Sequence, residues 1–335
     1  SKTVAVLGDD GQVRLVDIGT AKVTKTLKTG HNRSFDLAAS GSGRRLLVGA
    51  GDGDADNYSV GPLVVMDEGS GPRDFPSVNR DPSEWTGEYI ETELELSPDG
   101  RIAAFFAFGP KPGSEDIELR VTDTRTGRDV SRPLPVKTQD SYLSPIGMKF
   151  TPNSKFLITG TFTGLAELRN PRTGVLVRRI GQASSPTTAL AVSADSKRLA
   201  IATDREVRVF NIADGQMVGD PITTPDSRVT VMSFGASDDL IALGAADGTV
   251  AIWDLRSLAL VGPPSSGARI NGLVFADKDR LLLTGGANGT LTIRSLDSRS
   301  WRTEACDKAG RNLTRAEWRE LMADRPYHRT CSRWP

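Results

Sequence analysis

Seven short runs of similar sequence recur along this chain, and this internal repeat constrains the fold more than any other feature. When aligned, the runs hold Asp, Asn or Ser at their sixth position and apolar or small residues at their second and fourth positions. The sixth residues are Asp17, Asp67, Asp123, Asn170, Asn211, Asp254 and Ser295. The alternation predicts a strand with one buried face. The small polar residue predicts a turn directly after the strand, because its side chain can bond nearby backbone amides.

A second apolar strand precedes each run, and Asp-Gly or Asn-Gly often joins the two, as at Asp247-Gly248. A turn such as Ser97-Pro98-Asp99-Gly100 and one further strand come before that, and a weaker fourth strand follows. The sixth positions are separated by 50, 56, 47, 41, 43 and 41 residues. The last three separations match the roughly 40–45 residues of a four-stranded propeller blade. We therefore predict an all-β fold, a seven-bladed β-propeller of four-stranded antiparallel blades, with insertions in the first blades.

This pattern resembles the WD-repeat β-propeller family over residues 1 to about 300. Trp253-Asp254 is the dipeptide that names the family, and Gly30-His31 resembles its Gly-His pair. The first copy lacks an innermost strand and the last copy has only three strands. In the family, strands from both chain ends usually complete one blade, which removes open sheet edges. We expect the missing strand to lie upstream of Ser1, or the C-terminal tail to cover the gap.

The C-terminal tail carries the start signals of a helix. Thr314 and Glu317 are spaced as a capping box, and Leu313 and Trp318 are spaced as a hydrophobic staple. This predicts a short helix over about 314–323. Three of the five tryptophans lie in the tail: Trp301, Trp318 and Trp334. Because aromatic side chains of this size are rarely left in water, we expect the tail to dock on the propeller.

These signals divide the chain into a propeller, residues 1–300, and a tail, residues 301–335. Through the strings ACDKAGRNLTRAEW and RPYHRTC, the tail is similar to the end of many actinobacterial WD-repeat proteins. In those proteins the propeller is often attached to a signalling NTPase of the STAND type, a Ser/Thr kinase or a protease-like domain. The resemblance implies the C-terminal part of a larger bacterial signalling or defence protein with an upstream effector domain.

The chain has two cysteines, Cys306 and Cys331, and both lie in the tail. Free thiols and a disulfide that pins the tail both remain open. His328 lies three residues before Cys331, but a structural zinc site needs four ligands and only three are present. Two cysteines in so long a chain are typical of a reducing compartment, and the N-terminus has no apolar secretory core. We therefore expect a cytoplasmic protein.

Four long segments are expected on one face of the propeller, because loops between second and third strands emerge beside the loops that lead into each blade. The segments are Gly51–Pro62, Phe75–Ile90, Gly109–Asp116 and Lys137–Pro145. Long loops without structure of their own tend to be functional or disordered. They hold four aromatic residues of the types that dominate binding hot spots: Tyr58, Trp85, Tyr89 and Tyr142. We predict that these residues bind a protein or peptide partner. The alternative is that they only pack the insertions onto the propeller.

The first insertion contains the string DGDADN, which places Asp52, Asp54 and Asp56 at alternate positions before Asn57. Alternating carboxylates around a tight turn supply the oxygen ligands that Ca²⁺ requires. Position twelve of such a loop is Leu63 instead of the bidentate Glu of an EF-hand, so the match is partial. A weak calcium site and an acidic solvated loop are the two alternatives. No other cofactor is predicted.

The sequence does not indicate catalysis. Its 42 basic and 42 acidic residues cancel, so no net charge attracts nucleic acid or an anionic membrane, and no apolar run reaches the roughly 18 residues of a membrane helix. The chain has two histidines, His31 and His328, and no G-x-S-x-G, P-loop or H-E-x-x-H string. Which carboxylates converge near the propeller axis is left open. We predict a non-catalytic protein-interaction or sensor module. The alternative is a propeller that binds a small ligand or Ca²⁺.

Overall fold

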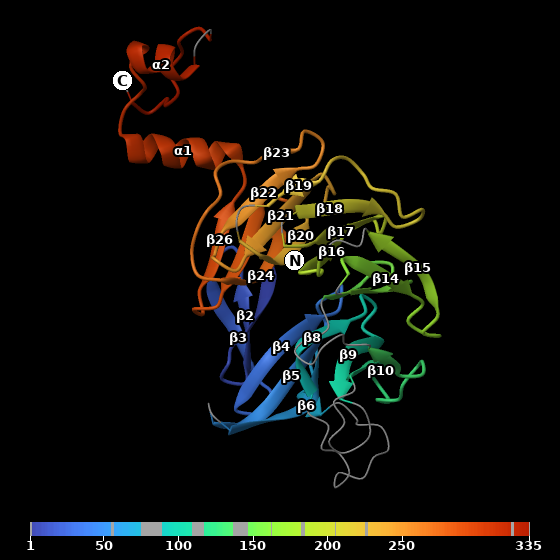
Figure 1. The fold of residues 1–335 in the computed structure, drawn as a ribbon. Coiled ribbons are helices and arrows are strands. Elements are labelled where there is room, and N and C mark those ends of the chain that lie inside the picture. The colour runs from blue at the N-terminus through green and yellow to red at the C-terminus, as the bar shows by residue number, and fades with distance from the viewer. Residues whose placement is uncertain are drawn as a thin grey trace.

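Seven antiparallel β-sheets form the body of the computed structural model (Figure 1). The structure describes residues 2–54, 57–74, 89–108, 117–136, 147–161, 163–181, 185–204, 206–224, 227–322 and 325–334. Each sheet is one blade, and the blades follow one another in chain order. The inner strands of successive blades contact one another from blade 2 to blade 7. The predicted seven-bladed, all-β propeller is therefore confirmed.

Blades 2 to 6 have four strands each, ordered from the inner to the outer edge. Blade 2 has β4 (Arg33–Ala39), β5 (Arg45–Asp54), β6 (Asn57–Asp67) and β7 (Pro72–Asp74). Blade 3 has β8 (Tyr89–Leu96), β9 (Ile102–Phe108), β10 (Ile117–Asp123) and β11 (Leu134–Val136). Blade 4 has β12 (Met148–Phe150), β13 (Leu157–Gly160), β14 (Leu165–Arg169) and β15 (Leu176–Gly181). Blade 5 has β16 (Ala189–Val192), β17 (Arg198–Ala202), β18 (Glu206–Asn211) and β19 (Ile222–Thr223). Blade 6 has β20 (Val229–Phe234), β21 (Leu240–Ala245), β22 (Val250–Asp254) and β23 (Ala259–Leu260).

Blades 1 and 7 have three strands each. Blade 1 has β1 (Thr3–Leu7), β2 (Gln12–Asp17) and β3 (Lys22–Lys28), and blade 7 has β24 (Ile270–Ala276), β25 (Leu281–Gly286) and β26 (Leu291–Ser295). Because β1 aligns with the second strand of the other blades, blade 1 lacks an inner strand and blade 7 lacks an outer strand, as the sequence indicates. Within the described ranges, β1 pairs with β2 alone, so neither the tail nor another strand covers its inner edge.

The core lies between neighbouring blades. Six clusters of buried apolar side chains fill the six interfaces from blades 1 and 2 to blades 6 and 7. Leu199 and Ile201 of β17 pack toward blade 4, whereas Ala200 and Ala202 of the same strand pack toward blade 6. Burial on both faces explains why the second strand of each repeat is continuously apolar. No such cluster joins blade 7 to blade 1 in the part of the chain that the structure describes.

In six blades, the polar residue that ends the third strand accepts hydrogen bonds from the turn that follows, as predicted. Asp123 accepts hydrogen bonds from the backbone amides of Arg125 (3.0 Å) and Thr126 (2.8 Å). Equivalent bonds are accepted at their own turns by Asp17, Asn170, Asn211, Asp254 and Ser295. Each side chain gives a hydrogen-bond partner to a backbone amide that the turn would otherwise leave without one. In blade 2, the Asp67 carboxylate pairs instead with Arg45.

A row of hydrogen bonds joins the turns between first and second strands of neighbouring blades. Asn153 N in blade 4 donates to Ser196 Oγ in blade 5 (3.1 Å), and Ala194 N in blade 5 donates to Asp238 Oδ1 in blade 6 (2.8 Å). The carboxylate of Asp279 in blade 7 accepts hydrogen bonds from two backbone amides of the blade 6 turn. Polar groups of this face are therefore used to join one blade to the next.

The tail contains two helices, α1 (Ser298–Ala309) and α2 (Arg315–Met322). The predicted helix corresponds to α2, whereas α1 was not predicted, because its described side chains show no buried apolar stripe that periodicity would reveal. The Trp301 indole donates to Ser295 O (2.5 Å) and lies near Arg294, which fixes the start of α1 on blade 7. In Figure 1, α2 lies beyond α1 at the top of the view. No described helix is both long and apolar enough to cross a membrane.

Candidate partner-binding surface

Among the described residues, the hairpin of β5 and β6 is paired over more positions than the corresponding hairpin of any other blade. After a register shift at Gly49/Gly51, the ladder continues through Gly51↔Val60 and Asp52↔Ser59 to Asp54↔Asn57. The equivalent hairpin of blade 5 ends at Ala202↔Val207. The additional paired residues, 51–54 and 57–60, are called the blade 2 arm below. The first predicted insertion is therefore largely an extended β-hairpin instead of an irregular loop.

The inner strand of blade 3 lies beside the base of this arm. β8 is eight residues long and pairs with β9 as far as Tyr89↔Ala107. It also contacts both β5 and β6. In each antiparallel blade, the first strand begins at the face where the second and third strands are joined. The blade 2 arm and the start of β8 consequently share one face of the propeller, which is the face opposite the row of hydrogen-bonded turns.

The strand ends that flank the other predicted insertions also open on this face. β7 ends at Asp74 and β8 begins at Tyr89, while β9 ends at Phe108 and β10 begins at Ile117. The same holds for β11 and β12 around the fourth segment. The antiparallel strand order thus puts the described strand ends that flank all four segments on one face.

Two of the four predicted aromatic anchors fall on described strands. Tyr58 lies on β6, where it pairs with Gly53, and Tyr89 is the first residue of β8. Trp85 and Tyr142 lie outside the described residues. The structure therefore places the backbone positions of Tyr58 and Tyr89 on the same face, and the partner-binding role of all four residues stays a prediction.

The predicted calcium ligands also lie only partly within the described residues. Asp52 and Asp54 lie on β5 within the ladder of the blade 2 arm, and Asp56 lies outside the described residues. Among the described residues, no group of three or more His, Cys, Asp or Glu side chains converges in a way that would hold a metal ion. The calcium site also stays a prediction.

Three charged residues on successive inner strands form a cluster that sequence reasoning did not locate. The Asp36 carboxylate on β4 accepts hydrogen bonds from the amides of Leu37 and Leu94, both at 2.7 Å. The Glu95 carboxylate on β8 pairs with the Lys149 ammonium on β12. These contacts link blades 2, 3 and 4. The sequence signal for the cluster is a charged residue between two apolar residues in the inner strand of each of these three blades.

The electrostatics of this cluster follow from its burial. Loss of solvation raises the pKa of the Asp36 carboxyl, against the opposing effect of the two amides and of Lys149. Burial likewise raises the pKa of Glu95, although the Lys149 ammonium favours its charged form. Both carboxylates already have protein partners. The cluster therefore functions chiefly as a connection between blades.

His31 also has a structural environment. Its side chain is 16% exposed, and its Nε2 lies 3.7 Å from Oδ1 of Asp74, the last residue of β7. Its backbone amide is held by the Thr29 hydroxyl at 3.1 Å. The histidine thus helps to fix the chain between blades 1 and 2.

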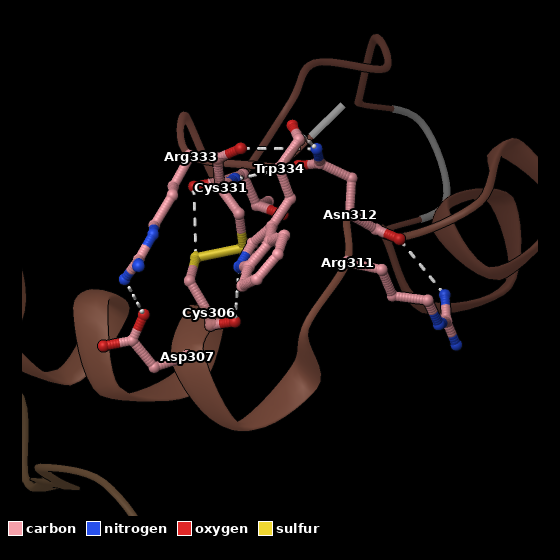
Figure 2. Close-up of a disulfide and its surroundings, with 8 residues drawn as sticks. Cys306, Asp307, Arg311, Asn312, Cys331, Arg333 and Trp334 are labelled. Atoms are coloured by element: carbon pink, nitrogen blue, oxygen red, sulfur yellow. Dashed lines mark hydrogen bonds and ion pairs between the residues drawn. A yellow bond between two sulfur atoms is a disulfide. The ribbon is translucent and has the colours of Figure 1, made fainter.

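A disulfide joins Cys306 of α1 to Cys331 near the end of the tail, with their Cα atoms 5.4 Å apart (Figure 2). Of the alternatives that the sequence leaves open, the structure therefore contains the bridge. The ring of His328 lies edge-on to Trp318, with the ring centroids 4.6 Å apart.

Comparison with known proteins agrees with this architecture. Residues 219–254 match the family model for the WD domain, G-beta repeat, and this range extends from the outer strand of blade 5 through the first three strands of blade 6. A stretch of 108 residues is 28% identical to the target of rapamycin complex subunit wat1 of Schizosaccharomyces pombe. That match covers 31% of this chain and 34% of the relative, so it spans about a third of each protein. The chain is a seven-bladed β-propeller in which one repeat matches the WD domain, G-beta repeat family.

Proposed function

We propose that this chain is a non-catalytic protein-interaction module that binds its partner through the face formed by the blade 2 arm and the start of β8. The observation that carries the proposal is the asymmetry of the two propeller faces. On one face, hydrogen bonds join the turns of neighbouring blades. On the other face, the β5–β6 hairpin of blade 2 is longer than the described hairpins of the other blades. Loops held by a rigid scaffold are typical binding elements.

The comparisons support the general class of this function. WD-repeat propellers are generally non-enzymatic scaffolds, and the similar yeast protein is described as a subunit of a complex. We further propose a bacterial signalling or defence context, a cytoplasmic location and an effector domain upstream in a longer chain. These finer proposals depend on the resemblance of the tail to actinobacterial proteins.

Affinity capture followed by measurement with the purified partner tests the proposal. The test variant combines Tyr58→Ala, Trp85→Ala, Tyr89→Ala and Tyr142→Ala. The matched control is Tyr327→Ala, which removes a 38%-exposed tyrosine from the tail. We expect the test variant to weaken binding by at least about tenfold and the control to leave the affinity unchanged.

Both variants must melt at the wild-type temperature for the comparison to be valid. An unchanged affinity of the test variant contradicts the proposed face. An equal loss in Tyr327→Ala moves the interaction to the tail. The small-ligand or calcium alternative predicts a different result, namely a rise in melting temperature when Ca²⁺ or the ligand is added to the isolated chain.

A further inference from the structure

The tail is held together with very little buried surface. Among its described residues, Asn312, Trp318 and Cys331 are buried, and no described side chain of α1 is. Segments shorter than about 40 residues usually need a disulfide, a metal or a partner to stay folded, because they cannot bury enough apolar surface. The Cys306–Cys331 bridge is therefore a major constraint on the folded tail.

The last described segment, 325–334, forms no helix or strand, and its contacts gather around the bridge (Figure 2). The Asn312 side chain accepts a hydrogen bond from Cys331 N (2.9 Å) and donates to Trp334 O (2.8 Å). The Trp334 indole donates to Cys306 O (3.0 Å), and Arg333 pairs with Asp307 (3.4 Å). Most of these contacts involve a cysteine or its neighbour, so they depend on the same local geometry as the bridge.

The same segment covers Trp318, the one large apolar side chain that is buried among the described residues of the tail. The Trp318 indole donates to Arg325 O (2.7 Å), and the rings of Tyr327 and His328 lie edge-on to it. Trp318 is only 2% exposed as a result. Movement of 325–334 away from α2 would therefore expose this side chain to solvent.

We propose that the Cys306–Cys331 disulfide is a redox-controlled latch that a cytosolic dithiol of the thioredoxin class opens, releasing segment 325–334 from Trp318. The two cysteines differ in exposure, since Cys306 is half-buried on α1 whereas Cys331 is only 6% exposed, so we infer that the reductant reaches the bridge from the side of Cys306. Disulfides with an accessible sulfur are the labile, regulatory ones, and a thiolate must reach a sulfur to break the bond. Both cysteines of the chain are in this bridge.

The reaction is a thiol–disulfide exchange. A thiolate of the reductant attacks Cys306 Sγ, the bond between the two cysteine sulfurs breaks, and its electron pair leaves on Cys331 Sγ, which takes up a proton. The second thiol of the reductant then attacks the mixed disulfide. This step frees Cys306 as a thiol and leaves the reductant oxidised, so two electrons pass from the reductant to the bridge.

Opening the latch changes the surface of α2. Trp318, Leu321 and Met322 are spaced i, i+3 and i+4, so they share one side of the helix. Leu321 is 66% exposed and Met322 is 36% exposed in the closed tail. Release of 325–334 adds Trp318 to them and completes an apolar stripe of the kind that binds in hydrophobic grooves. The latch thus controls the display of this stripe, independently of the propeller face proposed above.

Limited trypsin digestion of the full chain, with and without reduced thioredoxin, tests the latch. Arg329 and Arg333 are exposed cleavage sites within the segment. Alkylation and mass measurement report the number of free thiols. On reduction we expect cleavage after these two residues to accelerate on the order of a hundredfold. The disulfide limits the conformational entropy of the unfolded tail, so breaking the bond raises the population of the open segment that trypsin can cleave. The melting temperature of the propeller should not change.

Two variants complete the test. The double variant Cys306→Ser, Cys331→Ser should be cleaved rapidly with no response to reductant, and Ser332→Ala should behave like the wild type. A bridge that reduced thioredoxin leaves intact in the folded chain overturns the proposal, because the disulfide is then a static crosslink. Reduction without faster cleavage also overturns it, because the segment is then held without the bridge.

Discussion

The propeller and the tail are stabilised in different ways. Six blade interfaces are filled by clusters of buried apolar side chains, so a strand such as β17 packs against both neighbouring blades. The tail buries one large apolar side chain, Trp318, and closes the 25-residue span between its cysteines with a covalent bond. Repetition distributes stability over many contacts, whereas a short terminal segment concentrates it in a few. The propeller should therefore tolerate changes of redox state that the tail does not.

Among the tests of this comparison, Leu199→Ala should have the largest effect on the free energy of unfolding. Leu199 is fully buried between blades 4 and 5, so the variant leaves a cavity in the propeller core. We expect the free energy of unfolding to fall by about 3 kcal/mol. Urea unfolding followed by circular dichroism measures the loss. Leu321→Ala, at a 66%-exposed site of α2, is the control and should change stability by less than about 0.5 kcal/mol.

An intermediate effect is expected at the start of α2. Thr314 Oγ1 accepts a hydrogen bond from Glu317 N (3.2 Å), and Glu317 Oε2 accepts one from Thr314 N (2.8 Å), which confirms the predicted capping box. Thr314→Ala should destabilise the tail by about 1 kcal/mol and leave the propeller unchanged. Hydrogen exchange of the amides of α2 measures this change, and Thr314→Ser should restore the wild-type rate. A parallel loss in propeller stability would show that the two regions unfold together.

The smallest expected effect is a pH dependence of opposite sign in the two regions. Because burial raises the folded-state pKa of Glu95, the contribution of Glu95 to stability is full below the ordinary glutamate pKa of 4.5 and is lost as pH rises through the raised pKa. Two contacts of Glu317, with Arg311 and with the Thr314 amide, lower its pKa to about 2. The contribution of Glu317 is therefore present above pH 4.5 and is lost as pH falls toward 2.

Two variants separate these contributions. The stability of the wild type relative to Glu95→Gln should decrease from pH 4 to pH 7, as measured by urea unfolding of the propeller. The stability of the wild-type tail relative to Glu317→Gln should increase from pH 2 to pH 5, as measured by hydrogen exchange. If the stability of both regions changed with pH in the same direction, the predicted electrostatic difference between the propeller and the tail would be wrong.

Much of the propeller was predictable because its signals are local and repeated. The small polar residue after each third strand, as at Asp123, predicts a turn from one position. The Asp247-Gly248 hairpin is similar: Gly248 has φ +85°, and a Cβ there would collide with the Gly267 carbonyl. Signals of this kind depend on neighbours within a few residues, so they can be read without knowledge of the fold.

The antiparallel strand order puts the described strand ends that flank the insertions on one face, whereas the partner-binding role of the insertions stays a prediction. The form of the first insertion was less predictable. The DGDADN string was interpreted as a turn around an ion or a solvated loop, whereas Asp52 and Asp54 belong to an extended ladder. Hairpin pairing depends on the partner strand, and β6 supplies partners as far as Asn57 that a loop motif does not reveal.

The sequence by itself determined the number of blades, the strand order and the helix at Arg315–Met322, because each follows from hydrophobic periodicity and turn chemistry within short windows. Only the tertiary structure decided the contacts between distant positions. The Asp36, Glu95 and Lys149 cluster and the choice of a disulfide over free thiols both required residues far apart in sequence to be brought together. Their energies depend on burial and distance, which exist only once the chain has folded.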